Sequence, residues 1–182
     1  NVAAVLYMVP LSLGIATSAR VSYWLGAGDA TRARSVVFIG IRLSALMGIT
    51  LAAILSIANE ALAGLYSSSP AVLAITGGLL KWVAAYHAAD ALQTLCVFVL
   101  RSYRITMAPL AVYCLLLWGT GLGGGYMLAY RGLGPWAPMA SPVPFWAASA
   151  MALAVTASLF VLMLWLAIRP GARGAASGWQ ET

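Results

Sequence analysis

Five long apolar segments dominate this chain and restrict what it can fold into. They cover about residues 1–24, 35–58, 71–100, 106–130 and 144–168, and each is long enough to cross a membrane as an α-helix. Charged residues make up 8% of the sequence, whereas soluble domains carry roughly 25%. A soluble fold would lack the polar surface that it needs. The sequence therefore predicts an all-α, polytopic transmembrane helix bundle of about five helices.

Basic residues gather in alternate connections between these segments, and this asymmetry predicts how the chain lies in a bilayer. One set of connections, with the C-terminal stretch, holds Arg32, Arg34, Arg101, Arg104, Arg169 and Arg173. The other two connections hold only Arg131. Because Arg and Lys favour the cytoplasmic side, we expect a multi-pass protein of the cell inner (plasma) membrane with a cytoplasmic C-terminus. A nucleic-acid partner is not expected, since no basic patch with interleaved aromatic residues accompanies the net charge of +6.

The two ends of the chain differ in character. Residue 1 is Asn and lies inside the first apolar run, so we expect the chain to be a fragment of a longer protein. Residues 169–182 are polar, and we expect them to form a cytoplasmic tail. Near the opposite membrane face, Trp136, Phe145 and Trp146 fit a belt of aromatic residues at the lipid–water interface.

Asp90 is the residue that most clearly indicates a function. It is one of four acidic residues in the chain, and it lies inside the apolar segment LLKWVAAYHAADALQTLCVFVL (79–100). Inserting such an acid into a membrane costs about 2.5–3.5 kcal/mol, so it usually faces the bundle interior or a water-filled cavity. Two interpretations stay open. Asp90 either binds a coupling cation or holds helices together through a hydrogen bond or an ion pair.

Further polar side chains share a helix face with Asp90. At 3.6 residues per turn the face and its flanks consist of Trp82, Tyr86, His87, Asp90, Gln93, Thr94 and Val97. Asp90 and the Tyr86 hydroxyl offer the oxygen ligands that a hard cation such as Na⁺ takes. We therefore expect Na⁺ or H⁺ to bind at Asp90 and Tyr86. The remaining polar members, Gln93, Trp82, His87 and Thr94, are expected to line a cavity around them.

No arrangement of residues in the sequence predicts catalysis. The HExxH motif and the GxxxxGK[ST] phosphate loop are both absent, and no nucleophile lies in a pattern with a base. Cys96 and Cys114 lie in apolar segments outside any CxxC or Cys/His metal pattern, as small buried hydrophobic residues would. We expect neither an enzyme nor a bound cofactor.

Three stretches of the chain resemble one family of transporters. They are MVPLSLGIATSARVSYWLGAGDATRAR (8–34), YHAADALQTLCVFVLRSYRITMAP (86–109) and PFWAAS (144–149). In order and spacing they are similar to the C-terminal lobe of the multidrug and toxic compound extrusion (MATE) family, whose members read close to F-Q-x-x-D-A-x-Q and L-R-G-x-x-D-T in the second stretch. The chain departs from the family pattern at Ser102, at Ile105, and at Gly123, where a proline is usual.

This resemblance implies a secondary active antiporter of twelve helices in two lobes. Such proteins export small organic compounds, often cationic, in exchange for Na⁺ or H⁺. Residues 1–168 would form an incomplete C-terminal lobe with helices eight to twelve, and the missing N-terminal lobe of the same polypeptide would be its partner. Asp90 and Tyr86 match an acid and a tyrosine, one turn apart, that help to form the cation site in some members.

Two other functions stay open. A lipid-linked oligosaccharide flippase of the same architecture would handle anionic substrates in a cavity rich in Arg and Lys, whereas the spans here hold mainly Arg20, Arg42 and Lys81. A non-transporting membrane scaffold would lose its assembly, but no transport activity, when Asp90 is replaced.

Overall fold

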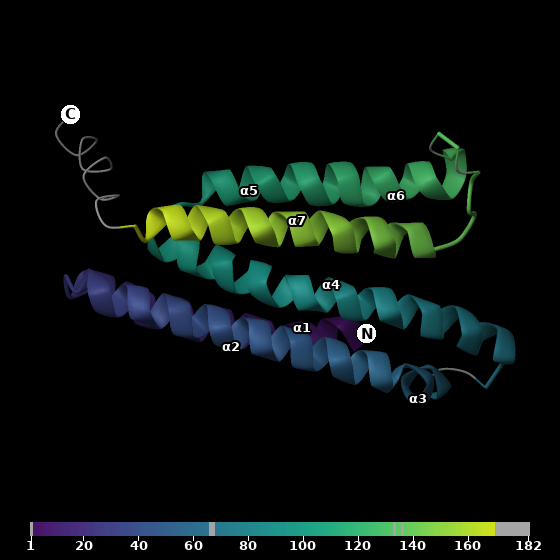
Figure 1. Ribbon diagram of the computed structural model, residues 1–182, viewed down its shortest axis with the longest axis horizontal. Coiled ribbons are helices and arrows are strands. Elements are labelled where there is room, and N and C mark those ends of the chain that lie inside the picture. The colour runs from purple at the N-terminus through teal and green to yellow at the C-terminus, as the bar shows by residue number, and fades with distance from the viewer. Residues whose placement is uncertain (1, 66–67, 133, 136, 170–182) are drawn as a thin grey trace.

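Helices make up the architecture, and they lie side by side with their axes roughly aligned (Figure 1). The computed structural model describes residues 2–65, 68–132, 134–135 and 137–169. The elements in chain order are α1 (Val2–Gly26), α2 (Ala30–Ile57), α3 (Asn59–Gly64), α4 (Pro70–Ser102), α5 (Met107–Tyr113), the π-helix η1 (Cys114–Gly123), α6 (Gly124–Tyr126), the π-helix η2 (Met127–Arg131) and α7 (Val143–Ala167).

Five helical stretches of the described chain are long and apolar enough to cross a membrane. They run Ala4–Gly26, Ala30–Ile57, Ile75–Ser102, Met107–Arg131 and Val143–Ala167. The fourth of them consists of α5, η1, α6 and η2 in succession, and we call it the fourth span. Since the described residues contain no strand, the predicted all-α bundle of five membrane-length helices is confirmed. The short helix α3 lies in a connection for which the sequence predicts no helix.

Helix α2 begins at Ala30, earlier than the expected residue 35, because Asp29 caps it. Asp29 Oδ1 accepts a hydrogen bond from the Arg32 backbone N–H at 2.9 Å, and Asp29 Oδ2 lies 3.2 Å from Arg32 Nε. The cap satisfies one of the amides that have no partner at the start of a helix. The polar first turn therefore extends the helix beyond the apolar segment from which its start was predicted.

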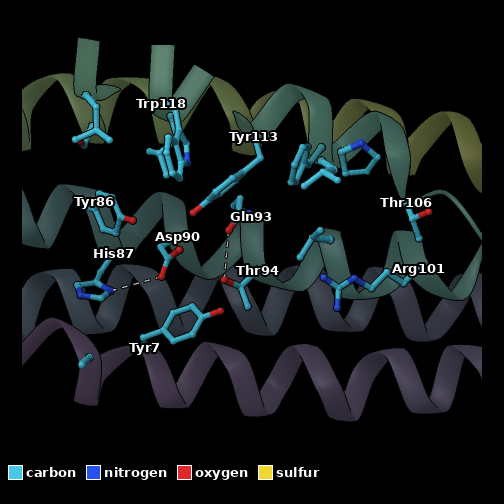
Figure 2. Close-up of a pocket in the computed structure, with 18 of the residues that line it drawn as sticks. Tyr7, Tyr86, His87, Asp90, Gln93, Thr94, Arg101, Thr106, Tyr113 and Trp118 are labelled. Carbon is cyan, nitrogen blue, oxygen red and sulfur yellow. Dashed lines mark hydrogen bonds and ion pairs between the residues drawn. The ribbon is translucent and has the colours of Figure 1, made fainter. Parts of the chain in front are cut away.

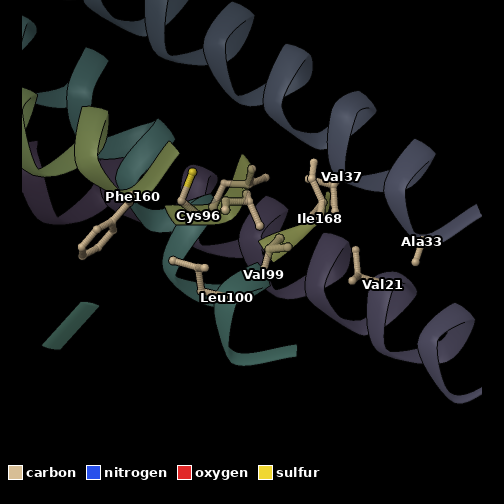
Figure 3. Packing of buried hydrophobic residues seen from close by; sticks show 10 residues of the cluster. Val21, Ala33, Val37, Cys96, Val99, Leu100, Phe160 and Ile168 are labelled. Atoms are coloured by element: carbon tan, nitrogen blue, oxygen red, sulfur yellow. The ribbon is translucent and has the colours of Figure 1, made fainter. Parts of the chain in front are cut away.

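Helix α4 is the centre of the bundle. In Figure 1 it runs between α1 and α2 on one side and α7 on the other, and its most extensive contacts are with these three helices. Buried residues of all four helices meet in one cluster (Figure 3), made of Val21, Ala33, Val37, Leu95, Cys96, Val99, Leu100, Phe160, Leu164 and Ile168. This cluster fixes the rotation of α4 about its axis and thereby the direction of its polar face.

Small residues let α2 approach α4 closely. Gly40, Ser44 and Gly48 recur every four residues on α2, and all three are buried. The Ser44 hydroxyl donates a hydrogen bond of 2.7 Å to the Ala91 carbonyl, and a Cβ on Gly48 would lie 3.0 Å from Ala91 Cβ and 3.1 Å from the Ala88 carbonyl oxygen. Small residues and interhelical hydrogen bonds are the main source of helix association where lipid removes the hydrophobic driving force.

The fourth span departs from regular α-helical geometry. Its π-helical parts, η1 and η2, belong to a rare class that is frequent at functional sites. The glycines of this span have two different roles. A Cβ on Gly125 would lie 2.9 Å from Phe145 Cα on α7, so close approach requires glycine there. Gly119 and Gly124 have nothing within 4 Å of the Cβ position, so their contribution is backbone freedom.

The predicted cytoplasmic tail, residues 169–182, lies outside the described residues except for Arg169. The guanidinium of Arg169 stacks on the Trp165 ring, 3.4 Å from its centroid. A cation on an aromatic face is stabilised by the ring quadrupole.

The close approach of α2 and α4 predicts that Gly48→Val lowers the free energy of unfolding by about 1–3 kcal/mol, the usual cost of overpacking. Gly78→Val is the matched control, because a Cβ at Gly78 meets nothing within 4 Å. Denaturant titration of the full-length protein in detergent, followed by tryptophan fluorescence, measures both. Equal unfolding free energies for the two variants would show that the α2–α4 contact is loose.

Candidate functional site

A cavity of about 800 Å³ lies between α1, α4, α7 and the first half of the fourth span (Figure 2). Helix α4 supplies most of its polar surface. The other elements supply mainly aromatic and aliphatic side chains, among them Tyr7, Tyr113, Trp118, Phe145 and Trp146. The cavity therefore combines an apolar, aromatic wall with a polar wall, which is the usual composition of a small-molecule site.

The polar wall is the face of α4 that contains Asp90. Tyr86, His87, Asp90, Gln93 and Thr94 all line the cavity, as does Val97 at the end of this face. Asp90 is 6% exposed, Gln93 7% and Thr94 1%. Helical spacing brings these residues together, because steps of three and four residues return to the same side of a helix.

Trp82 does not belong to this wall, and its prediction as a cavity-lining residue is wrong. The side chain is absent from the described lining and is 37% exposed. Trp82 lies eight residues before Asp90, and each step of four residues overshoots a full turn, so the two directions differ by about 80° around the helix. Residues spaced four apart on α4 therefore rotate away from the cavity, and Trp82 lies beyond its lining.

The hydrogen-bond and ion-pair partners of Asp90 lie on its own helix. Asp90 Oδ2 is 3.8 Å from His87 Nδ1. The Thr94 hydroxyl can donate a hydrogen bond to the Asp90 carboxyl group, or to Gln93 Oε1 at a distance of 3.4 Å from Thr94 Oγ1. Neither ring nitrogen of His87 has a hydrogen-bond partner among the described residues, although its side chain is buried. Among the residues that the structure describes, Asp90 forms no ion pair or hydrogen bond with a helix other than α4.

Residues from the other helices complete the site, and the sequence did not assign them to it. Phe145 and Trp146 line the cavity, and the Trp146 ring packs edge-on to Tyr86 with their centroids 5.9 Å apart. The first turn of α7 thus directs these two residues towards α4 and the fourth span, and their place in an interfacial belt stays a prediction. Trp136, the third member of the expected belt, lies outside the described residues.

Tyr7, Tyr113 and Trp118 also line the cavity (Figure 2). They occur in uncharged apolar segments, so no local pattern distinguishes them from residues that face lipid. Their position follows from how α1 and the fourth span pack around α4.

Arg101 lines the same cavity at a distance from Asp90. Eleven residues separate the two along α4, or about 16 Å at 1.5 Å per residue. Its guanidinium lies 5.1 Å from the Phe98 ring centroid, and the side chain is exposed. The positive charge is thus kept away from the carboxylate, and Asp90 stays available to another cation.

Oxygen atoms dominate the donors around Asp90. They come from its carboxylate, the Gln93 amide, the Thr94 hydroxyl and the hydroxyls of Tyr7, Tyr86 and Tyr113. The described residues contain no group of three or more His, Cys, Asp or Glu side chains that would suit a transition metal. Such a donor set suits a proton or a hard cation, while the aromatic wall suits an apolar or cationic organic molecule.

Comparison with known proteins gives consistent matches. Residues 1–127 match the family model MatE. The chain is 34% identical, over 93% of its length, to the probable multidrug resistance protein NorM of Aromatoleum aromaticum, of which it covers 36%. It is 30% identical, over 95% of its length, to the multidrug resistance protein MdtK of Pectobacterium atrosepticum, of which it covers 38%. It is 36% identical, over 74% of its length, to the multidrug resistance protein NorM of Burkholderia vietnamiensis, of which it covers 30%. The chain thus spans about a third of the length of these curated relatives.

Proposed function

Since the chain belongs to the MatE family, we propose that it is part of a secondary active antiporter that exports organic compounds in exchange for Na⁺ or H⁺. The observation that carries this proposal is the buried carboxylate of Asp90 on the wall of an aromatic cavity. In this proposal the protein is a transporter and not an enzyme. It crosses the inner membrane several times. The connections that are rich in arginine lie in the cytoplasm, together with the C-terminus.

Asp90 and Tyr86 bind the coupling cation in this proposal. A buried carboxylate has a strong tendency to gain a positive partner, and the nearest described basic group is the His87 imidazole, 3.8 Å away. Gln93, His87 and Thr94 line the surrounding cavity and shape the site. The coupling ion enters, binds and leaves, so it is a transported ion and not a resident cofactor.

The aromatic wall receives part of the organic substrate. Flat aromatic faces attract cations and apolar rings alike, and Tyr86 presents one such face next to the carboxylate. Cation and substrate then influence each other because they bind to adjacent groups, and this linkage is reciprocal. The rest of the polypeptide, which in the relatives is about twice as long as this chain, completes the translocation path.

A flippase for anionic lipid-linked substrates is supported less well. Arg101 is the arginine among the described residues that line the cavity, and the other basic side chain there is the imidazole of His87. A polyanionic headgroup would meet mainly aromatic and neutral polar groups.

The cation-binding role predicts that Asp90→Asn in the full-length protein lowers cation-driven efflux by at least about tenfold, which corresponds to a loss of 1.4 kcal/mol. Ethidium efflux from proteoliposomes under an imposed Na⁺ or pH gradient measures the rate. Glu60→Gln is the matched control, because Glu60 is exposed and remote from the cavity. Undiminished efflux by Asp90→Asn would refute this role.

The aromatic wall predicts that Trp146→Ala raises the KM for ethidium roughly threefold to tenfold, because an aromatic pair contributes about 0.5–1.5 kcal/mol. Trp82→Ala should leave KM unchanged, since Trp82 lies outside the described lining. Concentration dependence of efflux in the same proteoliposomes separates KM from kcat. Equal effects of the two substitutions would argue against substrate binding in this cavity.

A further inference from the structure

Two arginines on the outer face of α2 have no task in the proposed antiport. Arg42 lies inside an apolar segment, seven residues after its predicted start at residue 35, and its side chain is exposed. Arg34 lies eight residues before Arg42, in the second turn of α2. Among the described residues, neither arginine has a carboxylate within ion-pair distance. An unpaired arginine inside a membrane span is costly, so Arg42 requires an anion that the described residues do not supply.

Phe38 joins the two arginines into one stripe. It lies one helical turn from each of them, since residues four apart are neighbours on a helix surface. The Arg34 guanidinium lies 5.9 Å from the centroid of the Phe38 ring, which is 40% exposed. Helical side chains point towards the N-terminus, so the long side chain of Arg42 extends towards Phe38 and the membrane surface. The stripe therefore directs two positive charges to the same part of the membrane surface.

The rest of this face suits lipid better than it suits another helix. Figure 1 shows α2 at the edge of the bundle, on the side away from α5 and α6. Large aliphatic side chains surround Arg42, and each is more than half exposed: Ile39 at 56%, Leu46 at 64% and Ile49 at 65%. Small residues favour helix association in a membrane, and on α2 they lie on the opposite side, where Ser44 and Gly48 contact α4.

We propose that Arg34, Phe38 and Arg42 form a binding site for one anionic phospholipid. The lipid phosphate lies between the two guanidinium groups, which bind phosphate oxygens through charge-assisted hydrogen bonds. The acyl chains follow the aliphatic side chains around Arg42. The headgroup carries no amine, as in phosphatidylglycerol, because an ammonium group would oppose the attraction of two arginines. In the proposed orientation this lipid belongs to the cytoplasmic leaflet, and the site does not depend on the proposed antiport.

Native mass spectrometry of the full-length protein in detergent tests this site, because it resolves each bound lipid by mass. Dioleoyl phosphatidylglycerol and dioleoyl phosphatidylethanolamine are titrated separately, and the dissociation constant of the first bound lipid is measured. The variants are Arg34→Gln and Arg42→Gln, which remove the charge and keep a polar side chain. Arg131→Gln is the matched control, because Arg131 is exposed and ends the fourth span at the opposite end of the bundle.

We expect each stripe variant to weaken phosphatidylglycerol binding about fivefold, the equivalent of the roughly 1 kcal/mol that an arginine contributes near an anionic membrane surface. Phosphatidylethanolamine affinity should equal that of the parent protein in every variant, which also reports that the variant is folded. Arg131→Gln should bind phosphatidylglycerol as the parent does. Arg34→Gln lies outside the apolar segment and keeps the test decisive if Arg42→Gln does not fold.

Equal affinity of the parent protein for the two lipids would overturn the inference. Unchanged phosphatidylglycerol affinity in both stripe variants would overturn it too. If Arg42→Gln then also lowered the thermal stability, the anion beside Arg42 would be a carboxylate elsewhere in the polypeptide and not a lipid.

Discussion

A carboxylate buried among apolar helices needs a positive partner, and the rest of this structure is arranged around that need. Asp90 is 6% exposed, and its described ion-pair partner is the His87 imidazole at 3.8 Å on the same helix. The arginine that shares the cavity lies three turns away along α4. A charge without a strong resident partner in a low-dielectric site is unstable. The proposed exchange of cations or protons at this position would relieve that instability.

The helix packing keeps the carboxylate in this position. Helix α4 carries the polar face, and α2 can approach it closely because Ser44 and Gly48 present little side-chain bulk. The buried cluster around Leu95 and Val99 then fixes the rotation of α4. On the opposite side the fourth span has π-helical geometry, and nothing lies within 4 Å of the Cβ positions of Gly119 and Gly124. The cavity therefore has one firmly packed wall and one that is easier to deform.

The sequence predicted the spans and the polar face, because length, hydropathy and helical spacing are local properties. Asp90, Tyr86, His87, Gln93 and Thr94 therefore came together as expected. Trp82 did not, because each step of four residues exceeds a full helical turn. Two such steps turn its side chain about 80° away from that of Asp90. Tyr7, Tyr113 and Trp146 could not be predicted, because aromatic residues facing lipid and facing a cavity look alike in an apolar segment. The π-helical geometry of the fourth span likewise has no sequence signature beyond its glycines.

Displacement of a bound substrate by a cation tests most directly whether Asp90 links the two. Ethidium binding to the purified full-length protein can be followed by fluorescence anisotropy while Na⁺ is raised at constant pH, and then while pH is lowered without Na⁺. The account predicts that one of these ions releases ethidium from the parent protein and that neither releases it from Asp90→Asn. Release that persists in Asp90→Asn would contradict the account, because coupling would then occur at another group.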